Sequence, residues 1–210
     1  RADCVNRYGA TDMANGRYIA LDGAEGCGKS THASRLAIAL GAVLTRETGG
    51  TAIGRQIRTI LHDTSITNLA YRAEALLAAA DRAQHIAEIV APALTAGKHV
   101  VSDRSVYSTL AYQGYGRGLS IAEIRHINEW AVETTWPDLV LLIDAPTEVL
   151  ERRMRGRQLD RFEREGDSFH ERVRDGFRQM TLDEPDRWAV IDGSQSLEKV
   201  ATEIRTVVRD

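Results

Sequence analysis

The chain has few cysteines, no long apolar run and little net charge. Its 210 residues include two cysteines, Cys4 and Cys27, which are too few for a disulfide scaffold and lack the spacing of metal ligands. No apolar stretch approaches membrane-spanning length, and none resembles the apolar part of a signal peptide. The net charge of −3 gives no general attraction to nucleic acid. We therefore expect a cytoplasmic protein that binds neither a membrane nor nucleic acid.

Residues 1–16 are polar and show no hydrophobic periodicity. We expect them to be a flexible leader, a remnant of expression or an extension before an internal start, and to lie outside the fold. Residues 17–210 are sufficient for one domain with a substantial core, so we predict a single domain over this range.

Short apolar runs alternate with helical patterns through this domain. The apolar runs predict five strands, at residues 18–21, 42–45, 98–102, 139–144 and 188–192. Helical patterns lie between them, and Pro92 predicts a break or a second start within a long helical stretch. This alternation predicts an α/β fold: a five-stranded parallel sheet with helices on both faces, which together form a three-layer sandwich.

Four side chains are expected to be structural. Trp130, Trp136 and Trp188 are predicted to pack in the core or at its edge, and His32 is predicted to lie on a helix surface.

The loop after the first predicted strand has the pattern G-x-x-x-x-G-K-[ST], which is the phosphate-binding loop of P-loop NTPases. Its glycines bring backbone N–H groups close to an anion, and the following helix adds its positive N-terminal end. Lys29 can reach the β- and γ-phosphates of ATP, and the Ser30 hydroxyl can bind Mg²⁺. The predicted ATP-binding residues of this loop are Gly23, Ala24, Glu25, Gly26, Cys27, Gly28, Lys29, Ser30 and Thr31.

Two further features favour phosphoryl transfer. Asp103 and Arg104 follow a predicted strand, where Asp103 can hold Mg²⁺ opposite Ser30 and Arg104 can bind an acceptor phosphate. Residues 152–165 are rich in arginine and have no apolar face to bury, which predicts a mobile lid. The phosphate-binding loop contains no arginine, so the lid is the predicted source of catalytic positive charge. The alternatives are a surface ion pair at 103–104 and a solvated helix face at the lid.

Several motifs in the right order resemble those of the bacterial thymidylate kinases, which are nucleoside monophosphate kinases. Residues 45–51 look like T-R-E-P-G-G-T, residues 54–61 look like G-x-x-I-R-x-x-L, and residues 80–85 match A-D-R-A-Q-H. Residues 103–108 and 111–114 look like D-R-[YF]-x-x-S and A-Y-Q-G, and residues 159–163 match the lid motif L-D-R-F-E. The resemblance covers nearly the whole range from Tyr18 to Val208.

This resemblance implies transfer of the γ-phosphoryl group of ATP to dTMP, with Mg²⁺ as cofactor, by an enzyme that is a homodimer. It implies that Arg58 and Arg104 hold the acceptor phosphate and that Tyr112 lies under the deoxyribose. The implied acceptor-binding residues are Glu25, Glu47, Arg58, Arg82, Arg104, Ser108, Tyr112 and Gln113. The implied catalytic groups are Glu25, Lys29 and the lid residues Arg153, Arg157 and Arg161, while Arg152 would lie near adenine.

Three positions depart from the family pattern. Thr48 stands in place of a proline that favours a cis peptide bond, and Ser105 stands in place of an aromatic residue. Ala78 lies where the family often has a phenylalanine that stacks on thymine, and loss of such a ring can cost on the order of 1–3 kcal/mol of base affinity. The alternative functions are therefore a kinase for another pyrimidine or modified nucleoside monophosphate and, in a different class, a non-catalytic nucleotide-binding switch.

Overall fold

A computed structural model describes residues 16–209, so the predicted leader lies almost wholly outside the described residues. Five strands form one parallel sheet with the order β2-β3-β1-β4-β5. The strands are β1 (Tyr18–Asp22), β2 (Val43–Arg46), β3 (Val100–Asp103), β4 (Leu139–Asp144) and β5 (Trp188–Asp192). The predicted number, direction and approximate position of the strands are confirmed.

Helices connect the strands. The α-helices are α1 (Lys29–Leu40), α2 (Ala52–His62), α3 (Tyr71–His85), α4 (Ala91–Thr95), α5 (Val106–Thr109), α6 (Ile121–Val132), α7 (Thr147–Met154), α8 (Asp167–Asp183) and α9 (Leu197–Arg209). Two π-helical segments, η1 (Ile86–Val90) and η2 (Leu110–Gly116), continue α3 and α5. Pro92 lies at the beginning of α4, directly after η1. The chain stays helical from α3 through η1 into α4, so the predicted break or second start at Pro92 is seen only as a change in the helical hydrogen-bond pattern.

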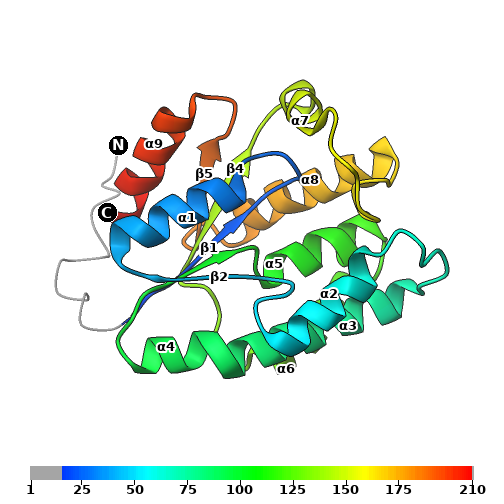
Figure 1. Cartoon of the computed structure of the whole chain (residues 1–210), viewed down its shortest axis with the longest axis horizontal. Helices are drawn as coiled ribbons and strands as arrows, with labels where there is room; N and C mark the ends of the chain where they lie inside the picture. Colours follow the sequence, from blue (N-terminus) through cyan, green and yellow to red (C-terminus); the bar gives the residue numbers. More distant parts are fainter. Residues whose placement is uncertain (1–15, 210) are drawn as a thin grey trace.

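The sheet separates two hydrophobic cores. Successive side chains of a strand point to opposite faces, and β1 shows the consequence. Ile19 and Leu21 pack with residues of α1 and α9, while Tyr18 and Ala20 pack with residues of α3, α5, α6 and α8. Figure 1 shows the resulting three layers, with α1 and α9 over one side of the sheet. This confirms the predicted three-layer sandwich.

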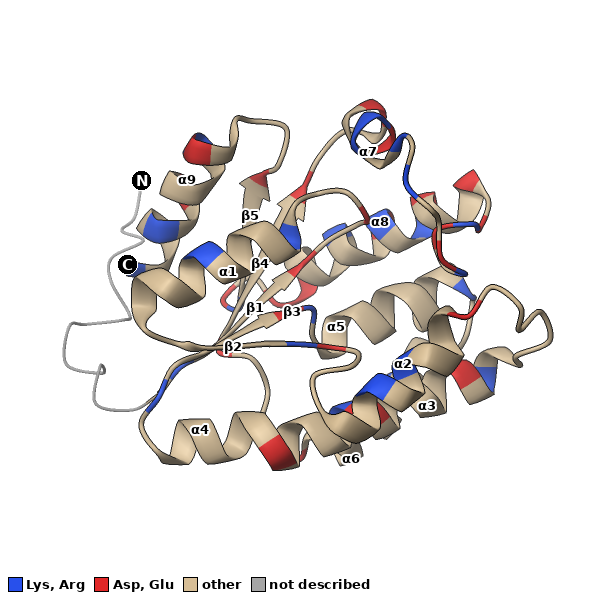
Figure 2. Cartoon of the chain, in the orientation of Figure 1, with Lys and Arg blue, Asp and Glu red and all other residues tan. Residues whose placement is uncertain are grey.

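The register of the sheet brings three loops together. Asp103 at the end of β3 is aligned with Leu21 of β1 and with Arg46 of β2. The phosphate-binding loop, the loop at 47–51 and the segment after β3 therefore emerge at one edge. Figure 2 shows charged residues at these strand ends, on α2 and on the segment between α7 and α8. Among residues 16–209, no helix is both long and apolar enough to cross a membrane.

Two expectations about single side chains are wrong. Trp130 is 84% exposed, so it packs neither in the core nor at its edge, although Trp136 and Trp188 contact the ring of Tyr107 as expected. His32 is buried, because the phosphate-binding loop covers this turn of α1 and Gly28 lies directly over the imidazole.

Candidate active site

The phosphate-binding loop connects β1 to α1 and closes against β4. Gly23 has φ 141°, and a Cβ atom there would lie 2.5 Å from the carbonyl oxygen of Ile143, so only glycine fits. Gly28 caps α1 in the left-handed conformation. Lys29 Nζ donates to the carbonyl oxygen of Ala24 at 2.7 Å, which places the ammonium group across the loop. The loop thus combines the N-terminal end of α1 with a lysine, as anion binding requires.

Ser30 and Asp103 meet beside this loop. Ser30 Oγ donates to Asp103 Oδ2 at 2.5 Å, although the two residues are far apart in the sequence. Both offer oxygen atoms, which are the ligands that Mg²⁺ prefers. No group of three or more His, Cys, Asp or Glu side chains within residues 16–209 could hold a metal ion. The pair therefore fits a site at which phosphate oxygens and water supply most of the ligands.

A charged pocket opens over the loop, between α2 and the segment that leads from α7 to α8. It is lined by Glu25, Gly26, Gly28, Lys29, Ser30, Thr31, Arg46, Arg58, His62, Asp103, Arg104, Arg153, Arg157, Gln158, Asp160 and Glu163. We call it the phosphate pocket. Of the predicted ATP-binding residues, Gly23, Ala24, Cys27 and Arg152 do not line it. Arg152 is an exposed residue of α7.

The lid arginines fall into two groups. Arg153 Nη1 donates to the carbonyl oxygen of Cys27 at 3.5 Å, and both Arg153 and Arg157 line the phosphate pocket. Arg161 instead donates from Nε to the carbonyl oxygen of Leu61 at 2.8 Å and pairs with Glu74 at 2.7 Å. Arg161 is therefore directed toward α2 and α3, and it does not line the phosphate pocket.

The expectation that the lid has no apolar face to bury is wrong at Phe162. Phe162 is buried and contacts the rings of His62 and Tyr112 edge-on. Polar contacts add to this packing, since His62 Nδ1 donates to Asp160 Oδ2 at 2.7 Å. The lid is thus fixed to α2 and η2 in this structure. The lid residues that precede the motif L-D-R-F-E are mostly charged, as expected. The phenylalanine of that motif, Phe162, was the sequence signal for burial that the prediction missed.

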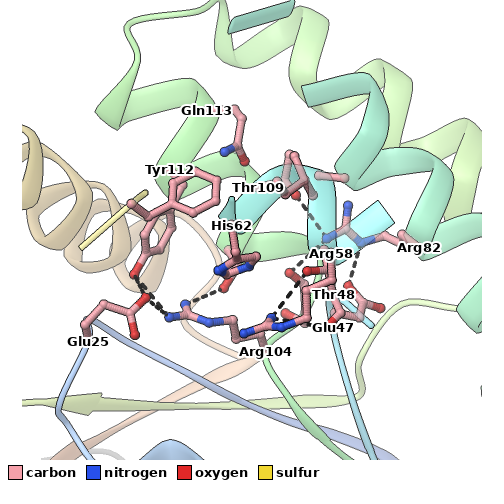
Figure 3. Close-up of a pocket in the computed structure, with 15 residues that line it drawn as sticks. Glu25, Glu47, Thr48, Arg58, His62, Arg82, Arg104, Thr109, Tyr112 and Gln113 are labelled. Atoms are coloured by element: carbon pink, nitrogen blue, oxygen red, sulfur yellow. Dashed lines mark hydrogen bonds and ion pairs between the residues drawn. The ribbon is translucent and has the colours of Figure 1, made fainter. Parts of the chain in front are cut away.

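A second pocket, which we call the acceptor pocket, adjoins the first and shares lining residues with it. Its lining residues are Glu25, Glu47, Thr48, Arg58, Leu61, His62, Ala78, Arg82, Arg104, Ser105, Ser108, Thr109, Tyr112, Gln113 and Phe162. All the residues predicted to bind the acceptor are among them. Figure 3 shows their side chains converging from the loop, α2, α3 and the α5–η2 segment.

Glu25 and Arg104 form an ion pair where the two pockets meet, and Tyr112 Oη donates to Glu25 Oε1 at 3.1 Å (Figure 3). Burial acts to raise the pKa of Glu25, but the charges of Arg104 and Lys29 outweigh it and lower the pKa to about 2. Glu25 is therefore ionised, and it faces the acceptor pocket as well as the phosphate loop. This arrangement accounts for an acidic residue within the loop, because Arg104 and Lys29 balance its charge.

Asp22 was not predicted, yet it organises the segment that carries Arg104. Ser105 Oγ and Ser108 Oγ donate to the two carboxylate oxygens of Asp22 at 2.5 and 2.6 Å. Ser105 also caps α5, accepting a hydrogen bond from the backbone of Tyr107. Arg104 itself has φ 76°, a strained value for a residue with a side chain. These contacts hold the strained turn that directs Arg104 into the pocket, and they explain why serine suits position 105.

Arg82 is almost wholly buried, and most of its hydrogen-bonding capacity is used by the protein. Its bonds to Glu47, Asn128, Ser105 and Thr109 use four of its five N–H groups. Glu47 also accepts from His85 Nδ1 at 2.9 Å. Burial acts to raise the pKa of Glu47, but Arg82 and His85 outweigh it and lower the pKa. Glu47 is thus a support for Arg82, and Arg82 keeps one N–H group for a ligand.

Three positive charges, those of Arg46, Arg58 and Arg104, lie close together in the phosphate pocket. Burial and the guanidinium groups of Arg46 and Arg104 lower the pKa of Arg58. Arg58 Nη1 donates to the carbonyl oxygen of Thr48 at 3.2 Å, and the Glu47–Thr48 peptide bond is cis even though position 48 is not proline. Mutual repulsion of the arginines is relieved by a bound anion, so this part of the pocket suits a phosphate group. Arg46 and His62 are pocket residues that the sequence analysis did not single out.

A phosphate-binding loop at the carboxyl edge of a parallel sheet, open to an arginine-lined acceptor pocket, defines the class as P-loop phosphotransferases. Comparison with known proteins narrows this class. The family model described as "Thymidylate kinase" matches residues 21–204. The chain belongs to the thymidylate kinase family, as its motifs predicted.

Individual relatives agree with the family assignment. A thymidylate kinase of Desulfovibrio desulfuricans is 46% identical over 91% of this chain and 94% of its own length. A thymidylate kinase of Chromobacterium violaceum is 44% identical over 93% of this chain and 94% of its own length. The crystal structure of thymidylate kinase from Ehrlichia chaffeensis has a TM-score of 0.77 at 30% identity, covering 93% of this chain and 99% of that one.

Proposed function

We propose that the chain transfers the γ-phosphoryl group of ATP to dTMP, giving dTDP and ADP, with ATP in the phosphate pocket and dTMP in the acceptor pocket. The observation that carries this assignment is the shared wall of the two pockets. Glu25, Arg58, His62 and Arg104 line both. An acceptor phosphate held by Arg58 and Arg104 therefore faces the triphosphate held by the loop, which is the arrangement that direct transfer requires.

The phosphate loop holds the donor. Backbone N–H groups between Gly26 and Ser30, together with Lys29, bind the β- and γ-phosphates of ATP. Ser30 and Asp103 hold Mg²⁺, which supplies positive charge to the phosphate oxygens when it is bound. The close contact between these two side chains supports this assignment, because one ion can be bound by both.

The lid supplies the remaining positive charge. Arg153 and Arg157 line the phosphate pocket, so we assign to them the stabilisation of charge on the transferred phosphoryl group. Arg161 holds the lid to Glu74, a positioning role in place of the catalytic one expected from the sequence. The acceptor phosphate is itself a nucleophile, so no strong general base is required.

In this proposal, the phosphate, the deoxyribose and the base of dTMP each contact different residues of the acceptor pocket. Arg58 and Arg104 hold the phosphate, Tyr112 lies under the deoxyribose, and Glu25 faces the sugar. Ser108, Gln113 and the remaining N–H of Arg82 face the base. Ala78 leaves the pocket wall on α3 without an aromatic ring, while Phe162 and Tyr112 supply rings from the lid and η2.

We also propose a homodimer. Ile53 and Ile60 of α2 and Leu76 of α3 are exposed apolar side chains on neighbouring helices, and a second copy would remove them from water. Light scattering coupled to size exclusion gives the mass directly. A monomer at micromolar concentration would contradict the proposal.

A cytoplasmic location is the remaining proposal. It is supported by the nucleotide substrates and by Cys27, a free buried thiol that suits a reducing compartment. Cell fractionation with an antibody to the chain tests it, and recovery in an oxidising compartment would contradict it.

The activity is tested by a coupled assay of ADP formation with ATP and Mg²⁺. We expect efficient turnover of dTMP and a clear preference for it over dUMP and dCMP. Equal use of all three would favour a kinase of broader pyrimidine specificity. No diphosphate with any nucleoside monophosphate would favour the non-catalytic switch. Omission of Mg²⁺, with EDTA present, is expected to abolish turnover.

A further inference from the structure

The side-chain amide of Gln113 is held in one orientation by a buried carboxylate. Gln113 Nε2 donates to Glu74 Oε1 at 2.8 Å, and both side chains are buried. An ionised carboxylate only accepts hydrogen bonds, so the amino group of the amide has to face Glu74. The amide oxygen of Gln113 then points the other way and accepts no hydrogen bond from the described part of the chain.

Two guanidinium groups pair with the side chain of Glu74. Arg117 donates from Nε and Nη2 to the two oxygens of Glu74, each at 3.2 Å. Arg161 Nη1 lies 2.7 Å from Glu74 Oε2. The oxygen Oε2 thus accepts one N–H from Arg117 and pairs with the charge of Arg161, while Oε1 accepts one N–H from Arg117 and one from the amide of Gln113. This asymmetry determines what a substitution at position 74 does.

The free oxygen of Gln113 belongs to the acceptor pocket. Gln113 lines this pocket, and Figure 3 shows its amide reaching from η2 toward the side where Tyr112, His62 and Thr109 lie. Arg82, on the same wall, keeps one N–H donor. Arg82 and Gln113 therefore present one donor and one acceptor to the edge of a base.

Pyrimidine bases differ in what this edge offers. Thymine and uracil carry a donor at N3, beside the acceptor oxygen O4. Cytosine carries an acceptor at N3, beside the donor amino group N4. An acceptor fixed opposite N3 pairs with thymine and uracil and repels the lone pair of cytosine. A site built to hydrogen-bond one group discriminates strongly against an analogue that lacks it.

We propose that Glu74 is a positioning residue for base selectivity, which fixes the Gln113 amide so that Gln113 Oε1 accepts the N3–H of the base. The proposal rests on the proposed function, because it takes dTMP as the acceptor substrate. Glu74 lies outside the motifs that carry the family resemblance, and it acts through Gln113 without touching the base.

The substitution E74Q tests this proposal because it reverses the amide. The new side chain has one oxygen, which is stabilised most at the position of Oε2, because that position accepts an N–H from Arg117 and lies beside the positive charge of Arg161. Its amino group then faces Gln113, and the Gln113 amide turns its oxygen toward position 74. The pocket now presents a donor opposite N3, so thymine and uracil lose a hydrogen bond and cytosine gains one.

The measurement is kcat/KM for dTMP, dUMP and dCMP at saturating ATP and Mg²⁺. For E74Q we expect the dTMP-to-dCMP ratio to fall about tenfold or more, with dUMP falling in parallel with dTMP. The matched control is E165Q, which weakens the ion pair of Glu165 with Arg117 Nη1 but leaves Gln113 untouched. This control should change the three substrates by the same factor.

A second variant keeps the test decisive if E74Q does not fold. Q113L removes the amide whichever way it faces, so it should lose most of the preference for dTMP over dCMP. In the Q113L background, E74Q or E74D should leave the ratio unchanged. An unchanged ratio in E74Q, or a retained preference in Q113L, would overturn the proposal. Failure of the wild-type chain to phosphorylate dTMP would instead overturn the proposed function.

Discussion

His62 Nδ1 and Asp160 Oδ2 lie 2.7 Å apart and join the last residue of α2 to the lid. His62 lines both pockets, and its ring also contacts Phe162 edge-on. Asp160 Oδ1 accepts from the backbone N–H groups of Phe162 and Glu163, so the same carboxylate shapes the lid turn. The acceptor pocket and the lid are therefore connected through one side-chain pair.

This pair predicts that His62 affects lid position more than chemistry. H62L removes the donor, and we expect KM for dTMP to rise several-fold, with a smaller effect on kcat. H62N places an amide N–H near the position of Nδ1 and should recover much of the loss. A double-mutant cycle with D160N measures the coupling, and strictly additive effects would contradict a shared function of His62 and Asp160.

Asp160 also predicts a pH dependence of stability. Burial acts to raise the pKa of Asp160, but hydrogen bonds from His62 and the backbone of Glu163 outweigh it and lower the pKa to about 2. Because the pKa is lower in the folded state, Asp160 stabilises the fold above the unfolded value of about 3.9. This stabilisation is lost as pH falls toward 2. Urea unfolding should show a difference between wild type and D160N at pH 6 that shrinks by pH 3.

Much of the fold could be predicted because each element carries a local signal. The apolar run at 139–144 and the glycine pattern at 23–28 depend only on neighbouring residues, so β4 and the phosphate loop were located closely. The sheet order could not be read from such signals, because it depends on which strands pair. Trp130 shows the same limit, since composition alone does not reveal whether a tryptophan is covered.

Residues that line the two pockets could be predicted where they belong to a motif. Residues that only support a pocket residue were missed. Arg82 and Glu47 were both assigned to the acceptor, but the structure joins them to each other. Asp22 gave no signal, because its role depends on Ser105 and Ser108, which lie more than eighty residues further along the chain. Contacts of this kind follow from the sheet order and could not be derived from residue spacing.

We expect substitutions of the lid arginines to lower kcat without preventing ATP binding. R157A or R153A should lower kcat by ~10³ or more while ATP still binds, because each removes charge that matters most in the transition state. R161A should lower kcat less and destabilise the fold, since it leaves Glu74 with one guanidinium partner. Coupled kinetics, calorimetric titration of ATP and thermal unfolding distinguish these outcomes. Nearly unchanged kcat in both R153A and R157A would refute the assignment.

We expect no part of the pH dependence of the activity to come from protonation of Glu25. With a pKa of about 2, Glu25 is ionised across the range in which the enzyme can be assayed. E25Q removes the charge that balances Arg104, and we expect kcat/KM for dTMP to fall by about 10². The ratio of wild-type to E25Q activity should stay constant from pH 5 to 9. A ratio that changes tenfold across this range would show that Glu25 titrates there.

We expect substitution of Ser105 to destabilise the fold more than substitution of an ordinary helix-capping residue. S105A removes both the cap of α5 and a hydrogen bond to the buried carboxylate of Asp22, which together are expected to cost about 2–4 kcal/mol. Ser120 is the matched control, because its side chain caps α6 by accepting from the backbone N–H of Glu123 in an exposed setting. S120A should cost about 1 kcal/mol.

Burial raises the pKa of Asp22, while its bonds to Ser105 and Ser108 oppose this shift. Removal of Ser105 therefore leaves a carboxylate that is harder to ionise. If chemical unfolding gives equal losses for S105A and S120A, Ser105 acts as a cap alone and the bond to Asp22 contributes nothing.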